Sequence, residues 1–230
     1  MTAATPALLA KARKHLFVAV VSDTLDNMGL VGQALAPAIR PLDEALTFLG
    51  RARTGMYREM FHVQPGNPYE LEIKLIDDLR KGEVAVLACS GNPRIAPWGE
   101  LLSTASKARG AAACVTDGLV RDIKAIRRMK FPVFAGGIGP LDSKGRGIVA
   151  EIDVPVELGG VRVPPGDLGF SGRVRADADA WPDRLKRLPF HTPPITANVK
   201  VTGPYENPLV RVDGDFARAE LYGYVIDSGH

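Results

Sequence analysis

The chain has 230 residues, enough for one sizeable hydrophobic core, and 46% of them are hydrophobic. Its 29 Lys and Arg residues nearly balance 26 Asp and Glu residues and are scattered, so the charge pattern does not predict binding to nucleic acid. No apolar run reaches the roughly 18 residues of a membrane span, and the first residues lack the order of a signal peptide. We therefore expect a cytoplasmic protein that does not bind membranes.

The first third of the chain predicts three helices and one strand. Ser22 is the expected cap of the second helix and Gly29 its end, while Asn67 caps the third helix and Gly82 follows it. Apolar spacing marks the elements: helices over 6–16, 22–29 and 67–82, and a strand over 46–57.

Strands and helices then alternate in a regular way. The order is strand 83–90, helix 99–110, strand 111–118, helix 120–130 and strand 131–137. Such alternation is typical of βαβ units and a parallel sheet. Residues 146–167 are rich in strand formers and turns, which predicts a second, β-only layer. The fold class is therefore α/β, with a central mostly parallel sheet and a second β layer.

The C-terminal quarter has a different character. Six prolines lie between Pro182 and Pro208, and hydrophobic periodicity is weak there. We expect one α/β domain over 1–168 and an atypical segment over 169–230 that packs on the same domain. Cys89 and Cys114 lie in apolar runs, which predicts buried thiols rather than metal ligands or a disulfide.

Charged residues follow two neighbouring elements of the predicted βαβ region. The helix from Gly99 descends about 15 Å and the strand that ends at Asp117 climbs back about 17 Å, so the two lengths nearly cancel. Glu100 is therefore expected to face Asp117, Arg121 and Asp122 across one crevice at the carboxyl edge of the sheet.

The chemistry of this crevice suits a metal and an anion. Three acids offer oxygen ligands to a hard divalent cation, and the arginine neutralises an anionic substrate. The free amides of Leu101 and Leu102 at a helix N-terminus add a carboxylate site. A simpler interpretation stays open: Asp122 only caps the next helix, Asp117 only makes a turn, and Arg121 pairs with a surface acid.

These residues lie in segments that resemble the RraA-like family. The segments fall between residues 20 and 168: VSDTLDNMG, IRPL, GRARTG, WGELLSTASKARGAAACVTDGLVRD, FPVFAGG and VPVELGGVRVPPGDL. The family includes 4-hydroxy-4-methyl-2-oxoglutarate and 4-carboxy-4-hydroxy-2-oxoadipate aldolases. The resemblance implies a swivelling α/β/β domain, assembled as a homotrimer or homohexamer with its sites at subunit interfaces.

The resemblance also implies a reaction and residue roles. A class II pyruvate aldolase of this kind uses Mg²⁺ or Mn²⁺ to bind a small keto acid, and the same enolate chemistry permits oxaloacetate decarboxylation. Asp122 would be the metal ligand, with Glu100 near the metal through water and assisting proton transfer. Arg121 would contact the keto or enolate oxygen. Substrate would also bind at three backbone positions: Gly99, Leu101 and Leu102. Asp117 is a further candidate.

The chain departs from the family pattern at two places. Glu100 stands where the aldolases have Asp, so its carboxylate extends one methylene further. After Leu168 the chain reads GFSGRVRADADAW instead of a strand and a helix whose glutamate reaches a neighbouring subunit. Glu220 is a candidate replacement for that acid, with a surface helix as the simpler interpretation. His62, in a loop, is either an acid or base near the site or a solvated side chain.

Two rival functions remain. RraA itself is a regulator that binds an RNA-degrading endonuclease, and that branch is expected to lack the acid after the arginine, whereas Asp122 is present here. Methyl transfer to a quinone is a third interpretation, but no glycine fingerprint for a methyl donor occurs. The sequence therefore favours a metal-dependent lyase.

Overall fold

The computed structural model describes residues 6–171, 197–202, 209–214, 219–221 and 224–226. The chain divides into two units, Met1–Arg173 and Val174–His230. Each unit is described separately below. No helix in the described ranges is both long enough and apolar enough to cross a membrane.

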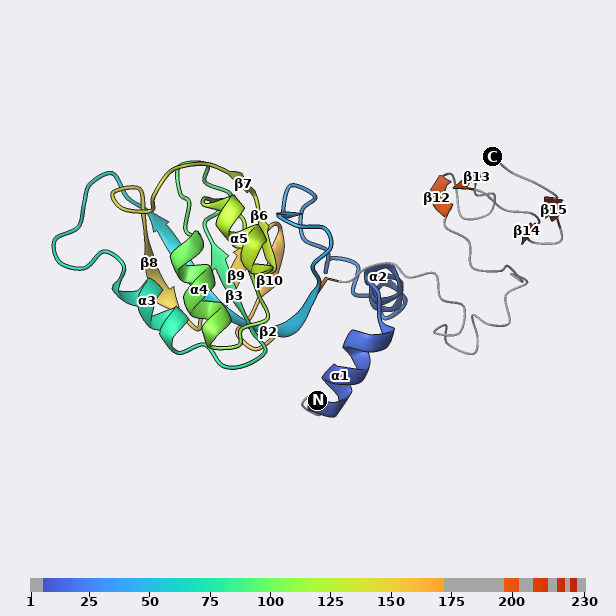
Figure 1. Cartoon of the computed structure of the whole chain (residues 1–230), viewed down its shortest axis with the longest axis horizontal. Helices are drawn as coiled ribbons and strands as arrows, with labels where there is room; N and C mark the ends of the chain where they lie inside the picture. Colours follow the sequence, from blue (N-terminus) through green and yellow to red (C-terminus); the bar gives the residue numbers. More distant parts are fainter. Residues whose placement is uncertain (1–5, 172–196, 203–208, 215–218, 222–223, 227–230) are drawn as a thin grey trace. The chain divides into compact units, whose positions relative to one another are not determined.

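A seven-stranded sheet forms the centre of the first unit (Figure 1). Its strands are β1 (Arg40–Pro41), β2 (Phe48–Glu59), β3 (Glu83–Ala88), β4 (Ala113–Thr116), β6 (Val133–Ala135), β8 (Gly147–Ile152) and β11 (Leu168–Ser171). The order is β1-β6-β4-β3-β2-β11, with β8 also paired to β2. The four inner strands are parallel, while β1, β8 and β11 are antiparallel to their partners. The predicted mostly parallel sheet is confirmed.

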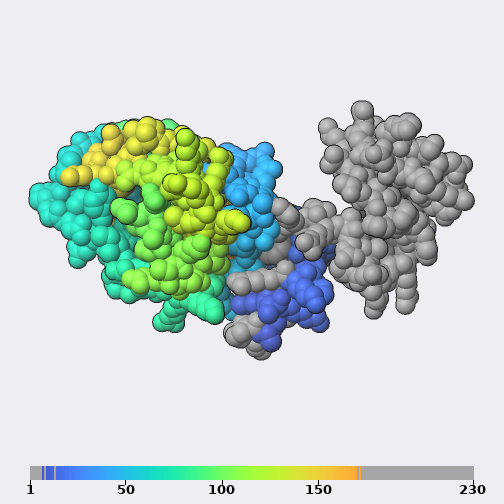
Figure 2. Space-filling model, in the orientation of Figure 1, coloured from blue at the N-terminus to red at the C-terminus, as the bar shows by residue number. Residues whose placement is uncertain are grey.

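Helices cover one face of this sheet. They are α3 (Glu70–Asp77), α4 (Glu100–Ala108) and α5 (Ile123–Met129). Their side chains make up much of the near face of the unit in the space-filling view (Figure 2). Leu75 of α3, Ile126 of α5 and Trp98 belong to the core of this face, each with at most 1% of its surface exposed. This core fixes the helices beside which the polar residues of the candidate site lie.

A β-hairpin covers the opposite face. It consists of β9 (Val156–Leu158) and β10 (Val161–Val163), and Val156 and Leu158 pack with Val84 and Val115 of the sheet. Because both faces are covered, β3 is apolar along nearly its whole length. The expected second β layer is confirmed, although β8 joins the central sheet rather than that layer.

Two helices precede the sheet, α1 (Pro6–His15) and α2 (Val18–Asn27). The prediction of Ser22 as the cap of the second helix is wrong, because the helix begins four residues earlier and Phe17 occupies the cap position. The Val21 N–H donates to the Phe17 carbonyl, so apolar residues form the first turn of the helix without a polar cap. Gly29 follows the helix with φ +78°, as its stop role requires.

The third helix is shorter than predicted. α3 begins after Tyr69, and the Asn67 side chain accepts the Tyr69 amide at 3.1 Å in the turn before the helix. Asn67 is therefore not the cap residue itself. Gly82, with φ +83°, lies after the helix and leads into β3.

The described part of the second unit consists of two hairpins. One pairs β12 (Ala197–Thr202) with β13 (Leu209–Gly214), and the other pairs β14 (Ala219–Leu221) with β15 (Tyr224–Ile226). Glu220 lies in β14, opposite Val225, so the surface-helix interpretation of this residue is wrong. The proline-rich residues from Pro182 to Pro194 lie outside the described residues.

Candidate active site

The two segments WGELL and DGLVRD lie side by side at the carboxyl edge of the sheet. Short strands β5 (Leu119–Val120) and β7 (Gly137–Ile138) pair there in parallel, and Trp98 bridges to Val120. Arg121 donates its backbone N–H to the Trp98 carbonyl at 3.0 Å. The matched lengths of α4 and β4 therefore produce the juxtaposition predicted from the sequence.

Asp122 links the two segments through its side chain. Its Oδ2 atom accepts the backbone N–H of Glu100 at 3.1 Å and lies 3.8 Å from Arg121 Nε. Asp122 also precedes α5 but makes no side-chain cap bond there, with a left-handed backbone at φ +56°. The carboxylate is thus turned away from the helix that it precedes and toward the N-terminus of α4, where helix dipole and free amides favour negative charge.

Gly99 leaves room for this arrangement. A Cβ atom at this position would lie 2.7 Å from Asp122 Oδ2 and 3.1 Å from Arg121 Cγ. Beneath it, the buried Trp98 indole donates to Ser103 Oγ at 2.7 Å, and Ser103 Oγ donates to the Gly99 carbonyl at 2.8 Å. A rigid buried framework therefore holds a glycine beside two charged side chains.

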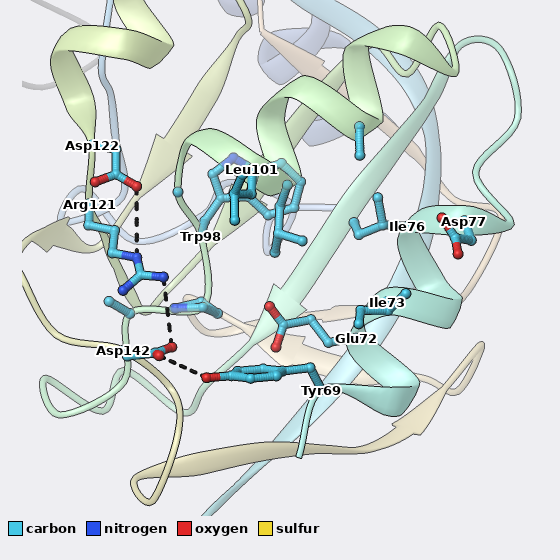
Figure 3. A pocket seen from close by; sticks show the side chains of 15 residues that line it. Tyr69, Glu72, Ile73, Ile76, Asp77, Trp98, Leu101, Arg121, Asp122 and Asp142 are labelled. Atoms are coloured by element: carbon cyan, nitrogen blue, oxygen red, sulfur yellow. Dashed lines mark hydrogen bonds and ion pairs between the residues drawn. The ribbon is translucent and has the colours of Figure 1, made fainter. Parts of the chain in front are cut away.

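A cavity of about 430 Å³ opens beside these residues (Figure 3). Its lining combines one guanidinium, several acids and an apolar wall: Tyr69, Glu72, Ile73, Ile76, Asp77, Ala96, Pro97, Trp98, Gly99, Leu101, Leu102, Ala105, Arg121, Asp122 and Asp142. The volume suits a small organic molecule. Four of the predicted site positions, Gly99, Leu101, Leu102 and Arg121, share this cavity with Asp122.

Asp142 and Tyr69 hold Arg121 at one side of the cavity. Its Nη2 atom lies 3.9 Å from Asp142 Oδ1, and the Tyr69 hydroxyl donates to Asp142 Oδ2 at 2.8 Å (Figure 3). Burial raises the pKa of Asp142, but the Tyr69 hydrogen bond and the charge of Arg121 outweigh burial and lower that pKa overall. Burial and the hydrogen bond to Asp142 raise the pKa of Tyr69 to about 12. Asp142 is thus ionised and stabilises the position of the Arg121 guanidinium.

Glu72 is a cavity residue that the sequence interpretation missed. It projects from α3 and is only 7% exposed, and burial raises its pKa to about 7. The signal was present in the sequence, because Leu75, Ile76 and Leu79 follow at helical spacing and are buried. A carboxylate on the apolar stripe of an amphipathic helix is unusual and marks a candidate functional group. Tyr69 and Asp142 had no comparable sequence signal.

The three predicted acids do not form a common ligand set. Asp117 accepts the backbone N–H groups of Cys89 at 2.5 Å and Gly91 at 2.8 Å, and it does not line the cavity. Glu100 contributes its amide to the site, while its side chain is exposed and also lies outside the cavity lining. Within the described ranges, no group of three or more His, Cys, Asp or Glu side chains is placed to hold a metal ion. Asp117 therefore stabilises the turn after β3.

The remaining candidates lie outside the cavity lining. His62 is exposed in the loop after β2 and does not line the cavity. Cys89 and Cys114 are buried free thiols, as predicted, and burial raises the pKa of both. Neither thiol is suited to act as a nucleophile at neutral pH.

A family model described as RraA-like, Aldolase/RraA, matches residues 18–179. Protein DlpA of Legionella pneumophila is 31% identical over 153 residues, which cover 66% of this chain and 24% of that protein. A Halalkalibacterium halodurans protein named "putative 4-hydroxy-4-methyl-2-oxoglutarate aldolase" is 36% identical over 149 residues, which cover 64% of this chain and 65% of that protein. The chain thus spans less than two thirds of either relative.

A solved structure shares the fold. The RNA-processing inhibitor RraA from Thermus thermophilis superposes with a TM-score of 0.52 at 28% sequence identity. The match covers 65% of this chain and 86% of that chain. The predicted α/β class with its second β layer is therefore the fold of RraA proteins.

Proposed function

Since the chain belongs to the RraA-like, Aldolase/RraA, family, we propose that it is a divalent-metal-dependent class II pyruvate aldolase. Its substrate would be 4-hydroxy-4-methyl-2-oxoglutarate or 4-carboxy-4-hydroxy-2-oxoadipate, and oxaloacetate decarboxylation would be a second activity. The observation that carries the proposal is the junction of Asp122, Arg121 and the amide end of α4 in one cavity. A cytoplasmic homotrimer or homohexamer with interfacial sites is part of the same proposal.

The donor set fits Mg²⁺ or Mn²⁺. Mg²⁺ commonly keeps several waters and needs only one or two protein carboxylates besides the oxygens of a substrate. Asp122 offers such a carboxylate at the cavity wall, and Gly99 keeps the space beside it clear. Asp122 would hold the cation, with Glu100 contacting it through water. When bound, the cation supplies Lewis-acid chemistry at the keto group of the substrate.

The residues of the chain orient the keto acid. The amides of Leu101 and Leu102, at the N-terminus of α4, would receive the substrate carboxylate. Arg121 would donate to the keto oxygen and neutralise the charge that develops there as the enolate forms. Asp142, braced by Tyr69, keeps the guanidinium at the cavity wall. Apolar neighbours such as Trp98 and Ile76 limit water around the reacting bond.

A protein-binding regulator is the alternative from another class. The Thermus relative carries the name of an RNA-processing inhibitor, so the shared fold does not decide between the two functions. Asp122 favours the enzyme, because a surface used only for protein binding does not need a carboxylate held in a left-handed backbone beside an arginine.

The test is pyruvate release. The purified protein is incubated with Mg²⁺ and each aldol substrate or oxaloacetate, with and without a chelator. We expect metal-dependent pyruvate from the wild type and at least a roughly 100-fold loss in Asp122→Asn. Asp23→Asn, an exposed acid of α2, serves as the matched control and should behave as wild type. Absence of metal-dependent pyruvate with every substrate would overturn the proposal.

A further inference from the structure

Glu72 lies where a helix normally places an apolar residue. Leu75 and Ile76 follow it by three and four positions on the buried side of α3, and Leu79 follows by seven positions just after the helix, with exposed fractions of 0%, 2% and 6%. Glu72 itself is 7% exposed. Glu70, two positions earlier on the same helix, is exposed. A buried carboxyl group weakens a fold unless it is paired or neutral, so this position needs an explanation beyond packing.

The surroundings of Glu72 supply hydroxyl groups rather than an ion-pair partner. Among the described residues it forms no ion pair, although the positive charge of Arg121 lowers its pKa and the negative charge of Asp142 raises it. The Tyr57 hydroxyl from β2 is buried and makes no well-aligned hydrogen bond among the described residues, but it lies close enough to Glu72 to act as a donor, which lowers the pKa of the carboxyl group. Ser143 acts on Glu72 in the same direction.

The carboxyl group points into the candidate active site. Figure 3 shows it extending from α3 toward the side of the cavity that holds Arg121 and Asp142. Asp122 lines the same cavity, so a small keto acid that touches Asp122 and Arg121 would fill the space in front of Glu72. The group is therefore placed to touch a substrate rather than only to support the wall.

The other polar groups of the cavity are less suited to move a proton. Asp142 has a lowered pKa and is committed to Arg121 and Tyr69. Tyr69, with a pKa of about 12, stays protonated and donates to Asp142. Glu72, with a pKa of about 7, populates both of its forms near neutral pH, the condition in which one group both accepts and donates efficiently.

We propose that Glu72 is the proton-transferring catalytic residue of the lyase reaction, an inference that rests on the proposed function. Its carboxylate accepts the proton of the C4 hydroxyl while the C3–C4 bond breaks, which leaves a new keto acid and the pyruvate enolate. The neutral carboxyl then gives that proton to C3, so the enolate becomes pyruvate and the carboxylate is restored. The same proton leaves oxygen and arrives at carbon, and no further reactant is consumed.

Deuterium exchange isolates this step from carbon-carbon cleavage. If Glu72 moves the proton, the holoprotein with Mg²⁺ should exchange the methyl protons of pyruvate in D₂O, followed by proton NMR. Glu72→Gln keeps the size and hydrogen bonding of the side chain but cannot transfer a proton. We expect it to lower both the exchange rate and kcat for pyruvate release at least about 100-fold, with little change in KM. Glu70→Gln is the matched control and should match the wild type.

The outcomes separate the two proposals. Wild-type protein that neither releases pyruvate nor exchanges its protons overturns the proposed function and, with it, the role of Glu72. An active wild type with Glu72→Gln within about threefold of it in both assays overturns only the role of Glu72. If circular dichroism shows that Glu72→Gln does not fold, Glu72→Asp decides, because it retracts the acid by one methylene. Exchange should then fall at least about tenfold; an unchanged rate contradicts the role.

Discussion

Replacing Glu72 by Gln should remove a pH dependence of stability that the wild-type protein shows between about pH 5 and about pH 8. Burial raises the pKa of Glu72 from the ordinary 4.5 to about 7. Across that interval the folded protein binds more protons at this position than the unfolded chain does. The contribution of Glu72 to the free energy of unfolding is therefore fully present below about pH 4.5 and is lost as the pH rises through 7. At about 1.4 kcal/mol per pH unit, the loss is about 3 kcal/mol.

Urea unfolding followed by circular dichroism measures this difference at one fixed protein concentration. The wild type should lose more stability than Glu72→Gln between the two pH values, by an amount of the order of the 3 kcal/mol above. Glu70→Gln, an exposed carboxylate of the same helix, should follow the wild type. Parallel pH dependences for the wild type and Glu72→Gln would refute the reasoning that the Glu72 carboxyl group resists ionisation because it is buried.

Two further predictions concern the cavity wall. Gly99→Ala places a Cβ atom 2.7 Å from Asp122 Oδ2, so kcat/KM for pyruvate release should fall by about 100-fold. The control variant Gly32→Ala, whose Cβ atom would meet no other atom within 4 Å, should leave kcat/KM unchanged. Equal activity of the two variants would show that the contact is relieved without displacing Asp122. Tyr69→Phe removes the hydrogen bond to Asp142, which is worth about 1 kcal/mol, and should lower kcat/KM by about fivefold. The melting temperature should change by no more than a few degrees. Unchanged kinetics would show that Asp142 keeps its position without this hydrogen bond.

The juxtaposition of the two halves of the site could be predicted from the sequence. In a βαβ unit the helix and the returning strand have nearly equal lengths, so Glu100 returns to the neighbourhood of Asp122 although 22 positions separate them. The sequence could not show which part of Glu100 is used. Its carboxylate is exposed, while its backbone amide meets Asp122, because the first free amides of a helix point beyond its N-terminal end.

Asp117 and Asp142 show the limits of sequence reasoning in opposite directions. Asp117 lies beside Gly118 in a charged motif, yet its carboxylate is engaged by the Cys89 and Gly91 amides in the turn after β3. Asp142 lies in a loop without periodicity, and only the folded chain brings it to Arg121. Local pattern carries information about helix faces and strand ends, whereas contacts made by long loops depend on the whole fold.

The sequence contains enough information to predict Glu72 as a candidate functional residue. Helical periodicity from Leu71 to Leu79 places it on the apolar stripe, where an acid is seldom found unless it has a partner or a function. The overall pattern of residues 67–82 predicts an amphipathic helix and does not single out this exception. The late start of α3 at Glu70 was not predictable in the same way, because Pro68 and Asn67 suit both a cap and the preceding turn.

The most direct test of the account is a crystal structure of the protein with Mn²⁺ and oxalate, a planar dianion that resembles the pyruvate enolate. The account predicts an anomalous peak for manganese at coordination distance from the Asp122 carboxylate, with oxalate facing Arg121 and the N-terminal amides of α4. The same experiment on Asp122→Asn should show no manganese there. Manganese bound elsewhere, or oxalate bound away from Arg121, would contradict the assignment of this cavity as a metal and enolate site.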